Sequence, residues 1–202
     1  MAKLVHIPPD QFFTLRSGDN LFASRMQTLA IPVNTHGVMG KGLAKETRLR
    51  FPEIFRRYSE LCENGELLIG KPRLVKKPNS PIARQRSNLQ LFPTMVPGHS
   101  HSQKYFLLFP TKGHWREKSK PDYLETGLKH VKRYYKTVSW KLESLALPAL
   151  GCGLGGLPWR LAGPLMCSIL AQLEIPVELY LPREKPVIPP EQLTTEFLLG
   201  EN

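Results

Sequence analysis

An apolar run, a glycine-rich loop and the start of a helix follow one another in the segment Leu145-Ala-Leu-Pro-Ala-Leu-Gly-Cys-Gly-Leu-Gly-Gly-Leu-Pro-Trp159. Residues 145–150 have the length and composition of a strand that is buried on both faces. Pro158 suits the first turn of a helix, which is predicted to continue to about residue 173. A buried strand that leads through glycines into a helix is typical of an α/β sheet.

Two more buried strands each end in a loop with polar residues. Residues 29–33 lead into Asn34-Thr35 and Gly37-Val-Met-Gly-Lys-Gly42, and residues 104–109 lead into Pro110-Thr-Lys-Gly-His-Trp115. The alternation of strands and helices predicts a three-layer α/β domain over residues 1–181, with a mixed central sheet and helices on both faces. The remaining elements are predicted as strands at 66–75 and 177–181 and as helices at 43–51, 53–63 and 121–135.

The two glycine-rich loops suit a phosphate ligand. Glycine lets main-chain N–H groups approach a phosphate, and the helix that follows presents its positive end. Two such loops facing each other would hold a diphosphate; the alternative is that both are tight turns that need glycine for packing. Residues 37–42 lack the Walker spacing, and Gly151-x-Gly153-x-x-Gly156 has too few strands after it for a dinucleotide-binding dehydrogenase.

Positive charge is concentrated in one part of the chain. The 202 residues carry a formal net charge of +11, and residues 71–136 hold 15 Lys and Arg against 3 Asp and Glu. No carboxylate occurs between Lys71 and Arg116. A block of one sign indicates a surface that faces an anion, with nucleic acid or polyphosphate as partner. A basic surface kept for solubility is the alternative.

The segment 76–103 breaks the pattern of strands and helices. Its prolines and polar residues predict a long basic loop inserted into the domain, and such loops are functional or disordered. Its cations would line a backbone track, and Phe92 and Met95 offer an apolar surface for bases, which together have the composition of a single-strand-binding surface. A disordered insertion with incidental charge is the alternative. The predicted nucleic-acid-binding residues are Lys76, Lys77, Arg84, Arg86, Trp115 and Arg116.

Composition restricts the remaining possibilities. The hydrophobic content of 41% is enough for one core, no apolar stretch has the length of a membrane helix, and a signal-peptide core is missing. Three widely spaced cysteines do not form a disulfide framework, and no metal site or cofactor is implied. We expect a cytoplasmic monomer that does not associate with a membrane. Residues 182–202 are expected to be a proline-rich linker or terminal extension, too short for a further domain that would neutralise a partner.

Four ordered motifs resemble a macro domain: Gly18-Asp19, Pro32–Ala44, Phe109–Arg116 and Leu147–Trp159. More narrowly, they resemble the branch that contains the terminal ADP-ribose protein glycohydrolase and the DarG-type DNA ADP-ribosyl glycohydrolases. The resemblance spans Arg16 to Leu181 without the loop 76–103. It implies an ADP-ribose ligand, and for the DarG type it implies ADP-ribosylated thymidine in single-stranded DNA and a cognate DarT-type ADP-ribosyltransferase.

The resemblance also implies roles for individual residues. Asp19 matches the residue that accepts a hydrogen bond from the adenine amino group, Asn34 matches the asparagine near the distal ribose, and Lys112 matches the catalytic lysine. Val38 to Leu43 match the first ligand loop of the family, and Leu150 to Leu157 match the loop that holds the diphosphate and the distal ribose. The implied substrate-binding residues are Asp19, Asn20, Thr35, Gly37, Val38, Met39, Gly40, Lys41, Gly42, Leu150, Gly151, Cys152, Gly153, Leu154, Gly155 and Gly156.

Chemical reasoning about Lys112 agrees with this role. Burial at the end of a strand and neighbouring cations are expected to lower the pKa of its amine, which would leave a neutral nucleophile. A surface lysine or a phosphate contact is the alternative. The protein-directed enzyme of this branch has an aspartate where this chain has Gly155, so the second catalytic group is expected to be His114, His36 or a water molecule. His114 and Trp115 could also stack on an exposed base, and a core position for Trp115 is the alternative.

The sequence therefore predicts an ADP-ribosyl glycohydrolase that acts on nucleic acid, with Lys112, Asn34 and His114 as catalytic residues. Two other functions stay open. A module that binds ADP-ribose without cleaving it would need all of these residues except Lys112, and an ADP-ribose 1″-phosphate phosphatase would use the same pocket for a different reaction.

Overall fold

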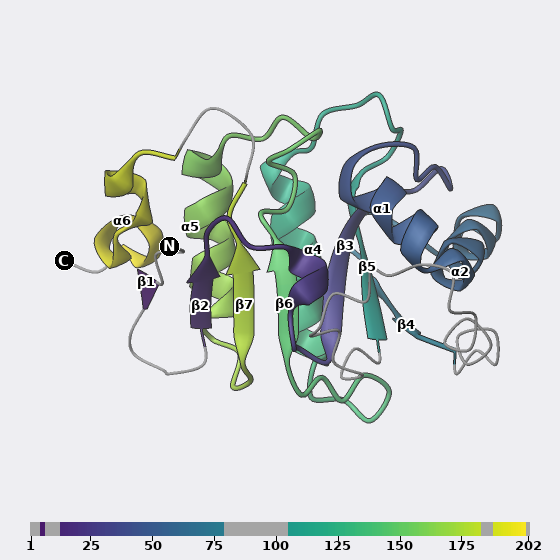
Figure 1. Ribbon diagram of the computed structural model, residues 1–202, viewed down its shortest axis with the longest axis horizontal. Coiled ribbons are helices and arrows are strands. Elements are labelled where there is room, and N and C mark those ends of the chain that lie inside the picture. The colour runs from purple at the N-terminus through teal and green to yellow at the C-terminus, as the bar shows by residue number, and fades with distance from the viewer. Residues whose placement is uncertain (1–4, 7–12, 79–104, 183–187, 201–202) are drawn as a thin grey trace, which may run out of the picture.

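The computed structural model describes residues 5–6, 13–78, 105–182 and 188–200, and in these parts seven strands form one sheet (Figure 1). The strand order is β1-β2-β7-β6-β3-β5-β4. The five inner strands run parallel, and β1 and β4 pair antiparallel at the two edges. The strands are β1 (Val5–His6), β2 (Phe13–Arg16), β3 (Thr28–Asn34), β4 (Arg73–Lys76), β5 (Tyr105–Lys112), β6 (Leu145–Pro148) and β7 (Val177–Tyr180).

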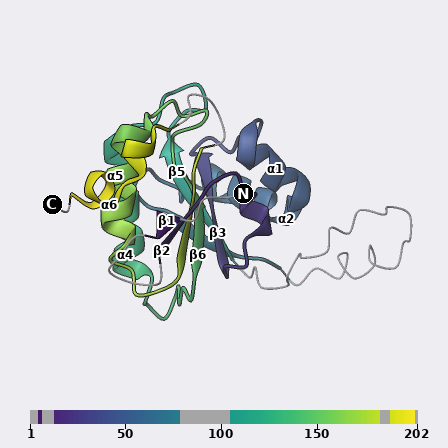
Figure 2. The same cartoon turned by 60° about the vertical axis from the view of Figure 1, so that its left-hand side comes forward.

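Helices cover both faces of the sheet, which confirms the predicted three-layer α/β fold (Figure 2). Successive residues of a strand point to opposite faces. Accordingly, Leu107 packs with α4 and α5, whereas Phe106 and Leu108 pack with α2. The helices are α1 (Gly42–Arg50), α2 (Pro52–Glu63), α4 (Pro121–Tyr134), α5 (Trp159–Leu170) and α6 (Thr195–Leu199), with short 3-10 turns η1 (Leu21–Ala23) and η2 (Pro190–Leu193).

The predicted strand at 66–75 is wrong for most of its length. Only Arg73–Lys76 forms a strand, and residues 68–71 make a tight turn closed by an isolated bridge between Leu68 and Lys71. Gly65 and Gly70 have φ angles of +66° and +74°, a backbone conformation that interrupts a strand. The apolar residues in this turn had suggested a continuous strand.

The C-terminal tail packs onto the domain where it is described. The indole Nε1 of Trp159 in α5 donates a hydrogen bond to the main-chain oxygen of Gln192 (3.1 Å), and Leu198 of α6 is buried. Residues 188–200 therefore pack on the domain through contacts with α5. Residues 79–103 of the predicted basic loop lie outside the described residues. In the part of the chain that the structure describes, no helix has the length and apolarity to cross a membrane.

The register of the central strands places two predicted catalytic residues side by side. Asn34, the last residue of β3, pairs with Lys112, the last residue of β5, after a shift in register at Val33. The glycine loop after β6 begins at the same edge, because β6 runs parallel to β3. The carboxyl ends of these strands therefore bring Asn34, Lys112 and both glycine loops to one edge of the sheet.

Candidate active site

A cavity of about 760 Å³ opens at the carboxyl ends of the parallel strands. Most of the residues predicted for ADP-ribose contribute to its wall, so the structure brings together motifs that are up to 135 positions apart in the sequence. The predicted residues that line it are Asp19, Asn20, Asn34, Val38, Gly40, Lys41, Gly42, Lys112, Trp115, Arg116, Gly151, Gly153 and Leu154.

The side chain of Asn34 fixes the shape of the first glycine loop, residues 37–42. Its Nδ2 donates to the main-chain oxygen of Val38 (2.6 Å), and its Oδ1 accepts from the main-chain nitrogen of His36 (2.9 Å). The hydroxyl of Tyr58 in α2 donates to the main-chain oxygen and to Oδ1 of Asn34, at 2.9 and 3.0 Å. Asn34 is 7% exposed, and its hydrogen bonds shape the first glycine loop while Tyr58 supports it from α2.

The second glycine loop has no room for a side chain at Gly155. A Cβ atom there would lie 2.3 Å from Ser119 Oγ and 2.4 Å from the main-chain oxygen of Gly151. The main-chain nitrogen of Ser119 also donates to the oxygen of Gly155 (2.9 Å), which fixes the loop against the residues before α4. An aspartate at this position would therefore displace the loop. The predicted second catalytic group is therefore not supplied by position 155.

Lys112 extends from the end of β5 toward the second glycine loop. Its Nζ donates a hydrogen bond to the main-chain oxygen of Leu154 (3.0 Å). Burial lowers the pKa of the Lys112 amine, and the charge of Glu117 raises it in part, so that the pKa lies below the ordinary value of lysine. The predicted direction is confirmed, although the neighbouring charge is an anion and not the expected cations. A lowered pKa increases the fraction of neutral amine, the form that can act as a nucleophile.

The two candidate histidines, His36 and His114, lie against each other near the Lys112 end of the pocket. Their ring centroids are 4.9 Å apart, and Nδ1 of His36 lies 3.0 Å from the main-chain oxygen of Gly113. His114 accepts a hydrogen bond at Nδ1 from the main-chain nitrogen of Arg116 (3.3 Å). Neither histidine lines the cavity, so both hold the adjoining loops in place. The prediction that His114 takes part directly in catalysis gains no support from this geometry.

A buried carboxylate network that the sequence did not reveal lies behind the lining residues Asp19 and Tyr180. Glu178 of β7 is 5% exposed and accepts hydrogen bonds from Ser24 Oγ (2.7 Å), Tyr180 Oη (2.9 Å) and Arg16 Nε (3.1 Å). Arg16 also lies 4.0 Å from the carboxylate of Asp19, and Tyr180 lines the cavity. The network connects Asp19, the residue predicted to select adenine, with Tyr180, and both residues line the cavity.

Several predicted binding residues lie behind the pocket wall. Met39 and Leu150 are buried in the cores, Gly37 packs on Cys62, and Thr35 donates to the oxygen of Gly113. Among the predicted residues that are described, those outside the lining are Thr35, Gly37, Met39, His114, Leu150, Cys152, Gly155, Gly156, Lys76 and Lys77. The cavity is also lined by residues not predicted: Leu21, Pro32, Val33, Leu43, Ala44, Glu46, Thr111, Pro148, Ala149, Tyr180, Leu181 and Pro182.

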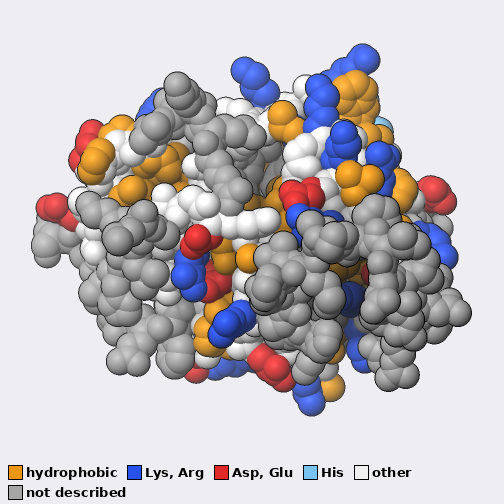
Figure 3. Space-filling model, in the orientation of Figure 1, with side chains coloured by type: hydrophobic (Ala, Val, Ile, Leu, Met, Phe, Trp, Pro, Cys, Tyr) orange, Lys and Arg blue, Asp and Glu red, His pale blue; other side chains and the backbone are white. Residues whose placement is uncertain are grey.

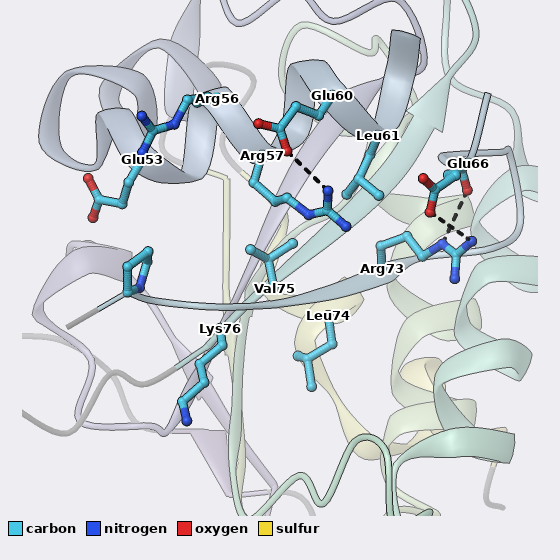
Figure 4. A pocket seen from close by; sticks show the side chains of 11 residues that line it. Glu53, Arg56, Arg57, Glu60, Leu61, Glu66, Arg73, Leu74, Val75 and Lys76 are labelled. Carbon is cyan, nitrogen blue, oxygen red and sulfur yellow. Dashed lines mark hydrogen bonds and ion pairs between the residues drawn. The ribbon is translucent and has the colours of Figure 1, made fainter. Parts of the chain in front are cut away.

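The predicted basic track begins at the opposite end of the strands from Lys112. Lys76 pairs with Tyr105 at the beginning of β5, seven residues and about 23 Å from Lys112 at its end. Lys76 lines a separate groove of about 650 Å³ between α2 and β4, in which its side chain points away from α2 (Figure 4). Lys77 lies over the ring of Phe51, and Arg84 and Arg86 lie outside the described residues.

Comparisons with known proteins agree with the fold and the pocket. A sequence model described as "Macro domain" matches residues 93–166. The chain is 46% identical over 189 residues to a DNA ADP-ribosyl transferase–DNA ADP-ribosyl glycohydrolase fusion protein of Thermosipho africanus, a match that covers 94% of this chain and 46% of the relative. The chain thus spans about half the length of this relative.

Two solved structures are also similar. The structure of Thermosipho africanus DarTG in complex with ADP-ribose superposes with a TM-score of 0.80 at 44% identity, covering 96% of this chain and 47% of that one. The macrodomain of Mycobacterium tuberculosis DarG superposes with a TM-score of 0.67 at 32% identity, covering 82% of this chain and 95% of that one. The chain belongs to the macro domain family. Within that family it is most similar, among these proteins, to the macrodomain portions of DarG-type proteins.

Proposed function

We propose that this chain hydrolyses the glycosidic bond between ADP-ribose and a nucleic acid. The observation that carries the proposal is the position of Lys112. Its Nζ lies at the junction of the two glycine loops, 3.0 Å from the Leu154 oxygen, and its pKa is lowered by burial. A module that only binds ADP-ribose has no need for an amine whose pKa is lowered at this point.

The pocket provides a complementary contact for each part of ADP-ribose. The carboxylate of Asp19 can accept a hydrogen bond from the adenine amino group, and the main-chain N–H groups of the two glycine loops can hold the diphosphate. The loop shaped by Asn34 then orients the distal ribose. In this arrangement Lys112 attacks the anomeric carbon as a neutral amine, the glycosidic bond to the nucleic acid breaks, and water then releases ADP-ribose from the lysine. The alternative is that Lys112 stabilises the leaving group as an ammonium ion while water attacks the anomeric carbon.

A nucleic acid is favoured over a protein as the carrier of ADP-ribose by two features. The chain has a net charge of +11, and Gly155 has no room for the aspartate found in the protein-directed branch. The names of the relatives specify DNA as the carrier. We propose ADP-ribosylated thymidine in single-stranded DNA as the substrate. We further propose a cytoplasmic monomer that acts as an antitoxin and in DNA repair by reversing the reaction of a DarT-type transferase.

The test compares three substrates at the same enzyme concentration. They are a single-stranded oligonucleotide with ADP-ribose on thymidine, a peptide with ADP-ribose on a side chain, and ADP-ribose 1″-phosphate. The proposal predicts release of ADP-ribose from the oligonucleotide at a rate well above that from the peptide. Faster release from the peptide, or dephosphorylation alone, would contradict it. Binding of ADP-ribose without cleavage of any of the three would favour a binding module.

A further inference from the structure

The loop between β5 and α4 forms a basic rim on the cavity. Together with Lys112 it contributes Arg116, Lys118 and Lys120, and the last three are exposed. The carboxylate of Glu117, the one acidic group in this loop, accepts a hydrogen bond from the main-chain nitrogen of His114 (3.1 Å). Lys and Arg side chains with hydrophobic ones among them project along the upper edge of Figure 3, where this loop runs in Figure 1.

Aromatic rings alternate with the cations on this rim. Trp115 is 45% exposed and lines the cavity, and the guanidinium carbon of Arg116 lies 4.5 Å from the centroid of its indole ring. Further along, Nζ of Lys120 lies 5.4 Å from the ring centroid of Tyr123. Trp115 is exposed and Tyr123 is half-buried. An exposed ring beside cations can stack on a base while the cations contact phosphates, which is how single strands are bound without sequence preference.

The rim is fixed to the ligand pocket by Ser119. This residue is buried between Lys118 and Lys120, and its main-chain nitrogen donates to the oxygen of Gly155 (2.9 Å). Its side chain packs against Gly151 and Gly155. The side chain of Lys118 passes beside Gly156. The two lysines are therefore held on the outer side of the loop whose inner side faces the cavity, and a polymer could contact both sites at once.

The other basic surface considered from the sequence is less suited to an anionic polymer. In the groove between α2 and β4, Arg57 pairs with Glu60 at 3.0 Å, and Arg73 lies 3.9 Å from Glu66 (Figure 4). Glu53 adds a third carboxylate to its lining. This groove has nearly balanced charge, and it lies on the α2 side of the edge strand.

We propose that the strand carrying ADP-ribose leaves the cavity over Trp115 and follows Arg116, Lys118 and Lys120. This inference rests on the proposed function, because it takes a single-stranded nucleic acid as the substrate polymer. Trp115 stacks on a base close to the modified one. Lys118 and Lys120, which the sequence analysis did not single out, contact backbone phosphates.

Binding assays on charge-matched variants test this path. The parent is Lys112→Ala, so that an ADP-ribosylated single-stranded oligonucleotide stays intact during the titration. One derivative adds Lys118→Ala and Lys120→Ala, and the other adds Lys76→Ala and Lys77→Ala. The affinity for the oligonucleotide is measured over a range of salt concentrations. The affinity for free ADP-ribose is measured on the same variants, so that effects on the pocket can be separated from effects on polymer binding.

The proposal predicts that the first derivative binds the oligonucleotide about tenfold more weakly than the Lys112→Ala parent at low salt. This loss is what remains after any change in the affinity for free ADP-ribose has been taken into account. The slope of log affinity against log salt should fall by about 1.4, because each phosphate contact on a single strand contributes about 0.7. The second derivative should match the parent. A loss confined to the second derivative, no loss in either, or a parent whose oligonucleotide binding is insensitive to salt would overturn the path. Hydrolysis by the wild-type protein would still decide the proposed function separately.

Discussion

Lys112 and Leu154 connect the end of β5 to the second glycine loop, through a hydrogen bond of 3.0 Å from the Lys112 amine to the Leu154 main-chain oxygen. The bond orients the amine toward the loop predicted to hold the diphosphate and distal ribose. Leu154 itself is 61% exposed, so the loop residue contributes its backbone and leaves the amine close to solvent. A ligand in the cavity therefore meets Nζ beside the second glycine loop.

The pH dependence of ADP-ribose release should report the state of Lys112. A neutral amine is needed for attack, so the rate should rise with pH through the Lys112 pKa, which burial places below the ordinary lysine value. The charge of Glu117 raises this pKa. Glu117→Gln should therefore move the inflection to lower pH. Glu46→Gln, which removes another carboxylate at the cavity, should leave it in place. An inflection that moves to higher pH in Glu117→Gln would contradict the assignment.

Substitution of Gly155 should damage the second loop. In Gly155→Ala the Cβ atom would meet Ser119 Oγ at 2.3 Å and the Gly151 oxygen at 2.4 Å, and the second contact involves backbone that cannot rotate away. We expect a loss of about 1–3 kcal/mol in the free energy of unfolding and a weaker affinity for ADP-ribose. Gly40→Ala is the control for stability, since its Cβ would meet only Val38 Cγ1, at 3.7 Å. An unchanged Tm in Gly155→Ala would show that the loop can adjust.

Tyr58 should support the first loop through a single hydroxyl. Tyr58→Phe keeps the buried ring and removes the donor to the main-chain oxygen and Oδ1 of Asn34. The free energy of unfolding should fall by about 1 kcal/mol, and the affinity for ADP-ribose should fall as the loop loosens. Phe55→Leu, a partly buried change on the same helix, is the control. Calorimetric titration with ADP-ribose measures the effect, and equal affinities for Tyr58→Phe and wild type would refute it.

Glu178 should make stability sensitive to acid. Burial alone would raise its pKa, but hydrogen bonds from Ser24, Arg16 and Tyr180 and the charge of Arg16 outweigh burial, and the pKa lies below the ordinary value of glutamate. The stabilisation is therefore present above the unfolded-state pKa and is lost as the pH falls through the folded-state pKa. Glu178→Gln should reduce stability at pH 7 by about 1–3 kcal/mol. Its free energy of unfolding should also depend less on pH below 5 than that of wild type, which denaturant titrations would show.

The parts of the site that follow directly after strands could be predicted from the sequence. Asn34 and Lys112 each follow a short apolar run that is typical of a buried strand, and parallel strands bring their carboxyl ends to one edge. The glycine loops were recognisable because their composition reports a backbone requirement. The three-layer order of elements followed from the same pattern.

The parts that depend on contacts between distant segments could not be predicted in this way. Glu178 reaches Ser24 and Arg16 across more than 150 residues, and its own segment, Val177–Tyr180, reads as an ordinary strand. The misplaced track at Lys76 has a related cause. The distribution of charge along the chain indicates a basic segment. Only the antiparallel pairing of β4 with β5 shows that Lys76 lies beside the first residue of β5, at the other end of this strand from Lys112.

The most direct test of the account is the single-turnover rate of ADP-ribose release from thymidine in a single-stranded oligonucleotide by wild type, Lys112→Ala and Lys112→Arg. We predict that both variants lose about a thousandfold or more in the single-turnover rate and retain their affinity for ADP-ribose. Alanine has no amine, and arginine keeps the positive charge but does not supply a neutral amine. Near-normal release by Lys112→Arg would show that only charge is required. Near-normal release by Lys112→Ala would contradict the central claim that the chemistry takes place at Lys112.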